Sequence, residues 1–292
     1  MILLTGAGGF IGSVVLGYLN KQDIKDIIVF DDLPNPEQFK NLVGKEFVSI
    51  HPHSIDERLN IEPIEIEAVV HIGANSDTLE KNWLSIYKTN VQSTRRWAKF
   101  CEENAIPFIF TSSAAVYGNG NGVLNQYAFS KQVSENEITN GVVLRLFNVY
   151  GPNEYHKGRM ASTIMHWHDK IKYGADVPLF AGSDEYCRDF VYVEDVARII
   201  HHFIKNYKPG VYDVGTGTAV SFTTLANELI KQMGRGNIKD VVMPADLESQ
   251  YQTFTQADTA NLEQSGFDTK SLMPYTKGVE AYITYLDKKL YY

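Results

Sequence analysis

The chain has 292 residues, more than one hydrophobic core usually takes, so we expect one large domain or two modest ones. Hydrophobic residues make up 44% and charged residues 21% of the chain, a composition that excludes a disordered, collagenous or coiled-coil protein. The 27 basic residues against 35 acidic ones give a net charge of −8, so we expect no nucleic-acid partner.

The cysteines and the apolar runs restrict the class of protein further. Cys101 and Cys187 are too few for a disulfide framework, and neither has a second cysteine or a histidine at metal-ligand spacing. No apolar stretch approaches the roughly 20 residues that a bilayer span needs, and the first residues show no signal-peptide pattern. We therefore predict a cytoplasmic protein with no metal and no membrane partner.

Short apolar runs alternate with helical patterns over the first half of the chain. The predicted strands are residues 2–4, Ile27–Phe30, 68–72, 108–111 and 142–147. Between them, residues 91–101 carry apolar side chains at helical spacing. This alternation is typical of a Rossmann-type, doubly wound parallel α/β sheet.

The pattern loosens after Tyr150, where glycines and prolines interrupt the apolar runs. Residues 189–196 and 211–214 nevertheless look like strands that return to the sheet, and Ser221 marks the start of a helix at Phe222–Met233. We therefore predict a dinucleotide-binding domain at residues 1–150, with returning segments near 189–216. A smaller α/β substrate-binding domain at residues 151–292 is then interleaved with it.

A glycine-rich turn follows the first predicted strand directly and leads into a predicted helix. Gly6 allows the tight turn, Gly9 lets the main chain approach a pyrophosphate, and Gly12 allows close packing. The helix amino terminus, at Phe10 and Ile11, then faces the phosphates. This context predicts a dinucleotide site; a tight turn without a ligand is the alternative.

Two carboxylates end the second predicted strand, about 20 residues after the glycines. Asp31 and Asp32 stand where an acid normally accepts hydrogen bonds from the adenine ribose, and they would repel a 2′-phosphate. Lys40 and Lys45 follow closely and could bind such a phosphate. The residues favour NAD over NADP; the alternative for Asp31 is a cap on the strand end.

Tyr127 and Lys131 are four residues apart and so share one face of a predicted helix. A cation beside a phenol lowers the phenol's pKa, which lets a tyrosine exchange a proton with a sugar hydroxyl near neutral pH. Ser113, at the carboxyl end of a predicted strand, supplies a hydroxyl that orients the substrate. By itself, a tyrosine and a lysine at this spacing are found as often on a surface helix as in a catalytic site. Together with the glycine turn and Ser113, the pair predicts a catalytic site.

Four motifs in chain order carry a resemblance to a known family: residues 5–12 (TGAGGFIG), 112–118 (SSAAVYG), 127–131 (YAFSK) and 188–193 (RDFVYV). On these motifs the chain resembles the extended short-chain dehydrogenase/reductases that act on nucleotide sugars. Three more stretches are similar to the ADP-glycero-manno-heptose 6-epimerases of that family: residues 147–152 (FNVYGP), 156–158 (HKG) with 160–162 (MAS), and 251–258 (YQTFTQAD).

The resemblance implies two acid/base groups, Tyr127 and Lys157, with Lys131 and Ser113 supporting the tyrosine. It implies a nucleotide-diphosphate-sugar site lined by Ser113, Asn148, Arg159, His166, Phe180, Ser183, Arg188 and Tyr251. It implies a cofactor site that also includes Gly73, Ala74, Asn75, Ser76, Asn90, Lys131, Val149 and Lys157. The implied cofactor is NADP, with NAD not excluded, and the implied assembly is a homo-oligomer.

The chemistry explains why two acid/base groups are useful. An exocyclic secondary carbinol is inverted by hydride transfer to bound NAD(P)⁺, reorientation of the resulting C6 ketone, and hydride return to its other face. The proton leaves and returns from two directions, so one base cannot easily serve both half-reactions. Lys157 must then be neutral in one step, which requires a lowered pKa. The alternative is that Lys157 only binds a diphosphate or cofactor oxygen.

Departures from the family pattern reduce the number of reactions that the chain is expected to catalyse. Ala114 and Ala115 stand where sugar 4,6-dehydratases carry an acid and epimerase-reductases a cysteine, which argues against both. The connection at residues 119–126 is short, which predicts a more open sugar pocket, and Arg159 replaces a smaller polar residue. The pair Asp31 and Asp32, with Gln38 downstream, departs from the usual NADP-binding set, which commonly includes a lysine around that position. The remaining alternatives are a nucleotide-sugar 4-epimerase or dehydrogenase that uses Tyr127 alone, and a non-catalytic dinucleotide sensor.

The other chemically active side chains have simpler interpretations. The pairs His51 with His53 and His201 with His202 lack acids or cysteines at ligand spacing, so we expect solvated or structural histidines. Cys187 is expected to be a passive small residue beside Arg188.

Overall fold

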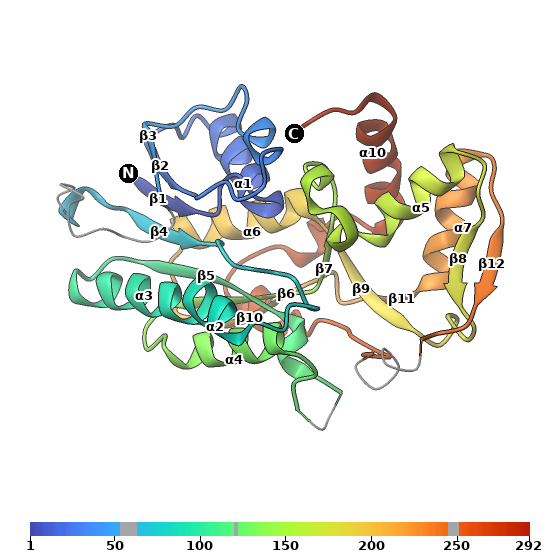
Figure 1. Cartoon of the computed structure of the whole chain (residues 1–292). Coiled ribbons are helices and arrows are strands. Elements are labelled where there is room, and N and C mark those ends of the chain that lie inside the picture. The colour runs from blue at the N-terminus through green and yellow to red at the C-terminus, as the bar shows by residue number, and fades with distance from the viewer. Residues whose placement is uncertain (53–62, 120–121, 245–250) are drawn as a thin grey trace.

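The computed structural model describes residues 1–52, 63–119, 122–244 and 251–292 of the chain. Its centre is a sheet of seven strands in the order β10-β6-β5-β4-β1-β2-β3, in which every neighbouring pair is parallel (Figure 1). The strands are β1 (Ile2–Thr5), β2 (Ile27–Phe30), β3 (Ser49–His51), β4 (Ala68–His71), β5 (Phe108–Ser113), β6 (Val142–Leu146) and β10 (Gly210–Val214). The predicted doubly wound α/β fold is confirmed.

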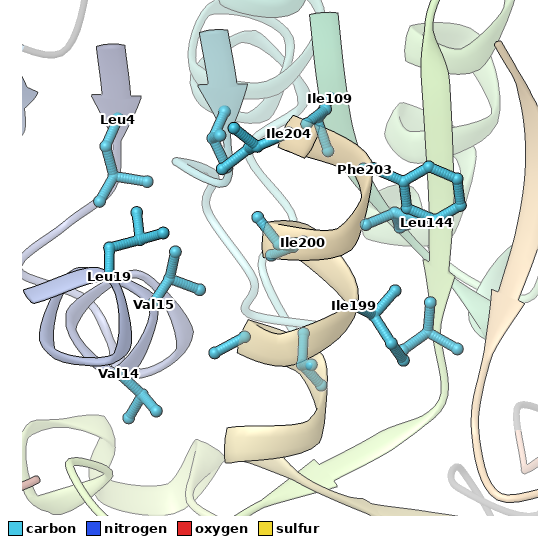
Figure 2. Packing of buried hydrophobic residues seen from close by; sticks show 14 of the residues in the cluster. Leu4, Val14, Val15, Leu19, Ile109, Leu144, Ile199, Ile200, Phe203 and Ile204 are labelled. Carbon is cyan, nitrogen blue, oxygen red and sulfur yellow. The ribbon is translucent and has the colours of Figure 1, made fainter. Parts of the chain in front are cut away.

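Both faces of this sheet are covered by helices, which is why its inner strands have continuous apolar sequences. On one face lie α1 (Phe10–Lys21) and α6 (Val193–Lys205), and on the other lie α3 (Ser93–Glu103) and α4 (Gln126–Asn136). Ile2 and Leu4 belong to the first hydrophobic cluster, and Leu3 packs in the second with Trp97 of α3. Figure 2 shows part of the first cluster, where α1 and α6 lie side by side against the strands.

The strand order reverses beside β1, and this reversal places the site. The chain proceeds from β1 to β2 and β3 on one side, and crosses to β4, β5 and β6 on the other. The helices that follow β1 and β4 therefore diverge to opposite faces of the sheet. Doubly wound sheets bind ligands at the carboxyl ends of the strands at such a switch point.

A second lobe, formed by residues after β6 and separate from the seven-stranded sheet, packs around its own hydrophobic cluster. Its small sheets have the orders β11-β9-β7 and β12-β8. Its elements are β7 (Asn148–Tyr150), α5 (Thr163–Lys172), β8 (Val177–Phe180), β9 (Cys187–Tyr192), β11 (Ala219–Ser221), α7 (Phe222–Met233), β12 (Ile238–Val241) and α10 (Tyr275–Lys288). The predicted division into domains at residue 150 stays a prediction.

The second half of the chain differs in part from the sequence prediction. Residues 193–196 are not strand but the first turn of α6, because they begin the apolar face that packs against α1. β9 joins the small sheet of the second lobe, so of the two segments expected to return, β10 alone pairs with the central sheet, beside β6. The helix α7 is confirmed, and the Ser221 hydroxyl caps it by accepting a hydrogen bond from the Thr224 amide.

Several short helices complete the described chain. They are η1 (Gln38–Asn41), η2 (Pro63–Glu65), α2 (Trp83–Ile86), a π-helix (Tyr87–Gln92), η4 (Ala114–Tyr117), η5 (Tyr155–Met160), α9 (Ala260–Gln264) and η6 (Thr269–Ser271). Within the described residues, no helix has both the length and the apolar character that a membrane crossing requires.

Candidate functional site

The glycine turn between β1 and α1 has the shape that a dinucleotide pyrophosphate requires. Gly6 has a φ of +73°, and a Cβ on Gly12 would lie 2.1 Å from the Gly6 carbonyl oxygen. The turn therefore packs directly on the first turn of α1. Gly9, the residue before α1, provides no side-chain cap, which leaves the amides of Phe10 and Ile11 in the uncapped first turn of the helix. The residues present fit a bound pyrophosphate.

Asp31, at the end of β2, is fixed against this turn. One carboxylate oxygen accepts a hydrogen bond from the Gly8 amide and the other from the Leu33 amide, each at 2.8 Å. Asp32 is exposed beside it. The structure thus combines both interpretations of Asp31: its carboxylate caps the strand end and also holds a negative charge next to the glycine turn.

The loop after β4 is tied to the glycine turn on one side and to α4 on the other. The Thr5 hydroxyl accepts hydrogen bonds from the Ile72 and Gly73 amides, and a Cβ on Gly6 would lie 2.6 Å from the Gly73 Cα. Ala74 is partly buried and Ser76 exposed in the same loop. The loop therefore follows the edge of the site from β1 toward the helix that carries Tyr127.

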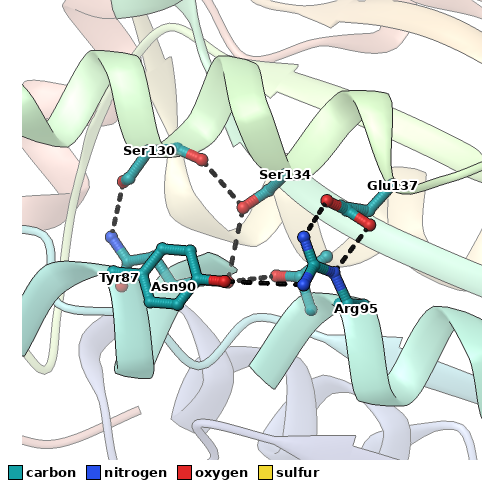
Figure 3. A network of polar contacts seen from close by, with 7 residues as sticks. Tyr87, Asn90, Arg95, Ser130, Ser134 and Glu137 are labelled. Atoms are coloured by element: carbon teal, nitrogen blue, oxygen red, sulfur yellow. Dashed lines mark hydrogen bonds and ion pairs between the residues drawn. The ribbon is translucent and has the colours of Figure 1, made fainter. Parts of the chain in front are cut away.

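Asn90, in the π-helix, makes this link through its side chain. Its amide nitrogen donates to the Asn75 carbonyl oxygen and the Ser130 hydroxyl, and its amide oxygen accepts from the Asn75 main chain at 2.8 Å. Figure 3 shows the contacts between Asn90 and α4, including the hydrogen bond from the Ser134 hydroxyl to the Asn90 carbonyl oxygen. Asn90 is almost fully buried, so its observed contacts are with protein groups that shape the site.

Tyr127, Lys131 and Ser113 lie together, as the sequence predicts. Asn125 caps α4 by accepting a hydrogen bond from the Ala128 amide, which starts the helix just before Tyr127. The Lys131 ammonium donates to the Thr111 carbonyl oxygen at 2.7 Å and lies 4.7 Å from the centre of the Phe110 ring. Both acceptor and ring belong to β5, which ends at Ser113.

The protonation of this group is set by burial. Burial lowers the pKa of Lys131 to about 7, and Glu135, one turn further along α4, opposes that change. Burial raises the pKa of the Tyr127 phenol, and its hydrogen bond with Ser113 lowers it. The net effect on the Tyr127 phenol is a raised pKa, against the expectation that the neighbouring cation lowers it, and Lys131 is close to its own titration at neutral pH.

Lys157 lies in η5, at the other side of the glycine turn. Its ammonium is 5.2 Å from the centre of the Phe10 ring, which begins α1. Asn153 fixes the segment by donating to the Ser13 hydroxyl at 2.8 Å, and Asn41 donates to the Asn153 carbonyl oxygen. Burial lowers the pKa of Lys157, against the effect of Glu154. The structure therefore brings Lys157 to the amino terminus of α1.

Arg159 lies in the same helix η5 and His166 in the following helix α5, and both contact other protein groups. The Arg159 guanidinium forms an ion pair with Asp77 at 2.7 Å, across to the loop after β4. His166 contacts the Arg159 carbonyl oxygen through Nε2 at 3.3 Å. Asp77 was not among the predicted residues, because its partner is 82 positions away.

The remaining predicted substrate residues form a group in the second lobe. The Arg188 guanidinium is 5.2 Å from the ring centre of Tyr251, which packs edge-on against Phe180. Arg188 donates hydrogen bonds to the carbonyl oxygens of Cys187 and Gln252, and burial lowers its pKa. The Ser183 hydroxyl donates to the Phe180 carbonyl oxygen at 2.6 Å. A buried cation between aromatic rings is suited to a nucleotide base and its phosphates.

Asn148 and Val149 lie on β7 and connect the two regions. They pair in register with Phe190 and Val191 of β9, and the Asn148 residue is exposed. Near the short connection that follows Gly118, the Gln252 side chain donates to the Gly118 carbonyl oxygen at 2.7 Å. Residues 120–121 of that connection lie outside the described residues, so the expected open pocket stays a prediction.

The structure adds a polar network that the sequence analysis missed. Arg145 on β6 binds Glu135 with two hydrogen bonds and also donates to the Tyr117 hydroxyl. The Tyr117 hydroxyl donates to Asp213 at 2.6 Å, and the Ser112 hydroxyl donates to Glu135. These residues are far apart in sequence and follow no period, so only the strand order brings them together.

The other histidines and Cys187 have contacts within the protein. The His51 ring contacts the Ser49 hydroxyl, and the His202 ring contacts Ser265. His201 packs edge-on against Tyr18, and His53 lies outside the described residues. Cys187 pairs its main chain with Thr253 and Thr255. In the described part of the chain, no three His, Cys, Asp or Glu side chains gather as a metal site.

Comparison with known proteins gives the family. Residues 2–215 match the NAD dependent epimerase/dehydratase family. The chain belongs to this family. The expected NAD-using epimerase is thus confirmed at the level of the family, together with the fold.

Members of this family that are similar to the chain span its whole length. An ADP-L-glycero-D-manno-heptose-6-epimerase of Brachyspira hyodysenteriae is 37% identical over 99% of this chain and 98% of its own. The crystal structure of the enzyme of the same name from Helicobacter pylori has a TM-score of 0.82 and 28% identity, over 98% and 96% of the two chains. A UDP-glucuronic acid 4-epimerase of Bacillus cereus, solved with UDP-glucuronic acid and NAD, shares the fold at 21% identity, with a TM-score of 0.80 over 99% of each chain.

Proposed function

We propose that this protein inverts the C6 configuration of an ADP-glycero-manno-heptose, using a bound NAD that is regenerated in each cycle. The observation that carries the proposal is Lys157 at the amino terminus of α1, in addition to Tyr127 and Lys131. The similar epimerases, aligned from end to end with this chain, name the substrate. A non-catalytic sensor needs the glycine turn but not these three side chains.

The residues divide the proton chemistry between two groups. NAD held at the glycine turn would supply the hydride acceptor and donor for inversion at C6. Tyr127 holds the proton of one half-reaction, and Lys131 stabilises its phenolate form by its charge. Lys157 holds the proton of the other half-reaction, because burial lowers its pKa and makes its neutral form accessible. Arg188, Tyr251 and Phe180 hold the nucleotide end of the substrate.

We propose NAD rather than NADP because the side chains around the adenosine end disfavour a 2′-phosphate. Asp31 is fixed beside Gly8 with its negative charge in place. Lys40 forms an ion pair with Glu37, and Lys45 donates to the Tyr292 carbonyl oxygen at 2.5 Å. Burial lowers the pKa of Lys45 to about 8, which leaves the side chain cationic at neutral pH but already bound to a main-chain acceptor.

The test is incubation of the purified protein with ADP-D-glycero-D-manno-heptose, followed by analysis of the product's configuration at C6. We expect conversion to the C6 epimer with no net redox change, and release of NAD from the denatured protein. Replacing Tyr127→Phe or Lys157→Ala should slow turnover by roughly 10²-fold or more, because each removes one acid/base group.

Two results would contradict this proposal. Unchanged heptose substrate with cofactor-replete protein excludes the substrate, and conversion at C4 of a UDP-sugar instead identifies a 4-epimerase. NADP alone in the released fraction excludes the proposed cofactor. The homo-oligomeric state and the cytoplasmic location stay predictions from the sequence.

A further inference from the structure

Glu154 is a carboxylate inside the protein that the sequence analysis did not identify. Its residue is 1% exposed. Four donors face its two oxygens: the Ser162 amide at 2.6 Å, the Ser162 hydroxyl at 2.7 Å, the Tyr282 hydroxyl at 3.1 Å and the Gly151 amide at 3.3 Å. Burial raises the pKa of the Glu154 carboxyl group above its ordinary value, and these donors together with Lys157 oppose that rise by favouring the ionised form. The Tyr282 phenol stays a donor, because burial and Glu154 raise its pKa well above the ordinary value.

The same residue is tied to Lys157. The Lys157 amide donates to the Glu154 carbonyl oxygen at 2.8 Å, so the two residues close one turn of η5. Each side chain acts on the other: Glu154 raises the pKa of Lys157, and Lys157 lowers that of Glu154, each against the effect of burial. The neighbouring His156 is neutral, because burial and Lys157 lower its pKa to about 4.

Glu154 also joins this turn to the second lobe. Tyr282 lies on α10, and Ser162 caps α5 by accepting a hydrogen bond from the Met165 amide. The adjacent Tyr155 donates to the carbonyl oxygens of Tyr285 and Leu290 at the end of α10. The turn that carries Lys157 is therefore held from the second lobe by consecutive side chains.

We propose that Glu154 is a positioning residue for the reaction: its buried carboxylate fixes the turn that carries Lys157 and sets the charge state of the Lys157 ammonium. This inference rests on the proposed role of Lys157 as an acid/base group. Glu154 itself does not exchange protons with the substrate. Its negative charge keeps Lys157 protonated up to a higher pH than burial alone allows.

The first experiment needs no substrate and therefore separates this inference from the proposed function. By reciprocity of the two charges, removing the cation in Lys157→Met should leave Glu154 protonated at neutral pH. Infrared difference spectra should show the carbonyl band of a buried carboxylic acid in Lys157→Met, absent in the wild-type protein. A band already present in the wild type, or none in Lys157→Met, would overturn the inference.

The second experiment uses turnover. In Glu154→Gln, which keeps the shape of the side chain, the limb of the pH–rate profile assigned to Lys157 should move to lower pH by about one pH unit. Tyr282→Phe is the matched control, because it removes a hydrogen bond to the Glu154 carboxylate but leaves the charge of that carboxylate in place. The corresponding limb of the pH–rate profile of Tyr282→Phe should therefore stay within about 0.3 pH unit of the wild-type limb. A limb that is unmoved in Glu154→Gln, or that moves equally in both variants, indicates a structural role alone. If Glu154→Gln does not fold, the infrared result decides.

Discussion

Lys131 shows at the scale of one residue how the site reduces stability. Its ammonium is nearly fully buried and has one carbonyl oxygen as a hydrogen-bond acceptor. Its pKa is lowered from 10.5 to about 7, so below pH 7 the folded and unfolded states both carry the proton, and the folded state bears the full desolvation penalty. Between about pH 7 and 10.5 the unfolded state binds more protons, and stability rises with pH.

We therefore predict that Lys131→Met unfolds at higher urea concentration than the wild type at pH 6. This advantage should shrink as the pH rises from 7 toward 10, because the wild-type lysine loses its penalty over that range. Equilibrium urea unfolding at pH 6, 8 and 9.5 measures the difference. Lys99→Met, at an exposed position on α3, is the control and should show a constant difference. A constant difference for Lys131→Met as well would show that its pKa is not lowered.

At the scale of elements, the π-helix is the part of the fold that aligns the site. The extra residue in its turn brings Asn90 to where it contacts both the β4 loop and α4. The loop after β4 and the helix α4, which carries Tyr127, belong to different crossovers of the sheet, so the Asn90 side chain sets their separation.

We predict that Asn90→Ala destabilises the protein by about 2 kcal/mol or more, because buried polar groups of Asn75 and Ser130 lose their partner. The variant should also lose bound cofactor faster during dialysis. Asn82→Ala is the control: it removes the exposed cap of α2 and should cost only about 1 kcal/mol with unchanged cofactor retention. Equal behaviour of the two variants would mean that Asn90 is an ordinary helix residue.

At the scale of the whole molecule, the ion pair between Arg159 and Asp77 joins η5, which is tied to the second lobe, to the loop after β4 at the edge of the proposed cofactor site. The pair is largely exposed on the Arg159 side, so its contribution to stability is expected to be about 0–1 kcal/mol. The pair can still restrain the motion of η5 relative to the loop after β4, because that restraint does not depend on how much the pair adds to the free energy of unfolding.

We predict that Arg159→Ala changes the unfolding temperature little but increases the rate of cofactor dissociation several-fold, with the effect reduced at high salt. Arg95→Ala is the matched control, because Arg95 binds Glu137 with two hydrogen bonds between α3 and α4, on one face of the sheet (Figure 3). It should lose similar stability and keep the wild-type dissociation rate, measured by fluorescence of the reduced cofactor. Equal rates in all three proteins would show that the pair does not restrain the two lobes.

The sequence predicts the central strands and the local motifs well, for a physical reason. β1, β2 and β4 are buried on both faces, so their sequences are continuous apolar runs. β3 and β12 are short, mixed in polarity and partly exposed, so no period marks them. Val193 is apolar and follows β9 directly, so the apolar run continues into α6 and the sequence does not mark where the strand ends and the helix begins.

The residues of the candidate site also fall into two groups, those that the sequence predicts and those that only the structure reveals. The glycine turn, Tyr127, Lys131 and Lys157 are carried by short contiguous motifs, and the structure places them at one edge of the sheet. The pairing of Arg159 with Asp77 and the network around Glu135 depend on residues from different strands and loops. Such pairs are fixed by topology, which no single stretch of sequence contains.

The strand order has a consequence for how the chain is made. β6 ends at Leu146, but its outer neighbour β10 begins only at Gly210, about 60 residues later, after much of the second lobe. At the usual speed of a ribosome that interval lasts several seconds. During it the nascent sheet exposes the unpaired edge of β6, whose residues are nearly all buried in the finished protein. A chain interrupted between these strands is therefore expected to aggregate, and its rescue to depend on chaperones that bind extended apolar segments.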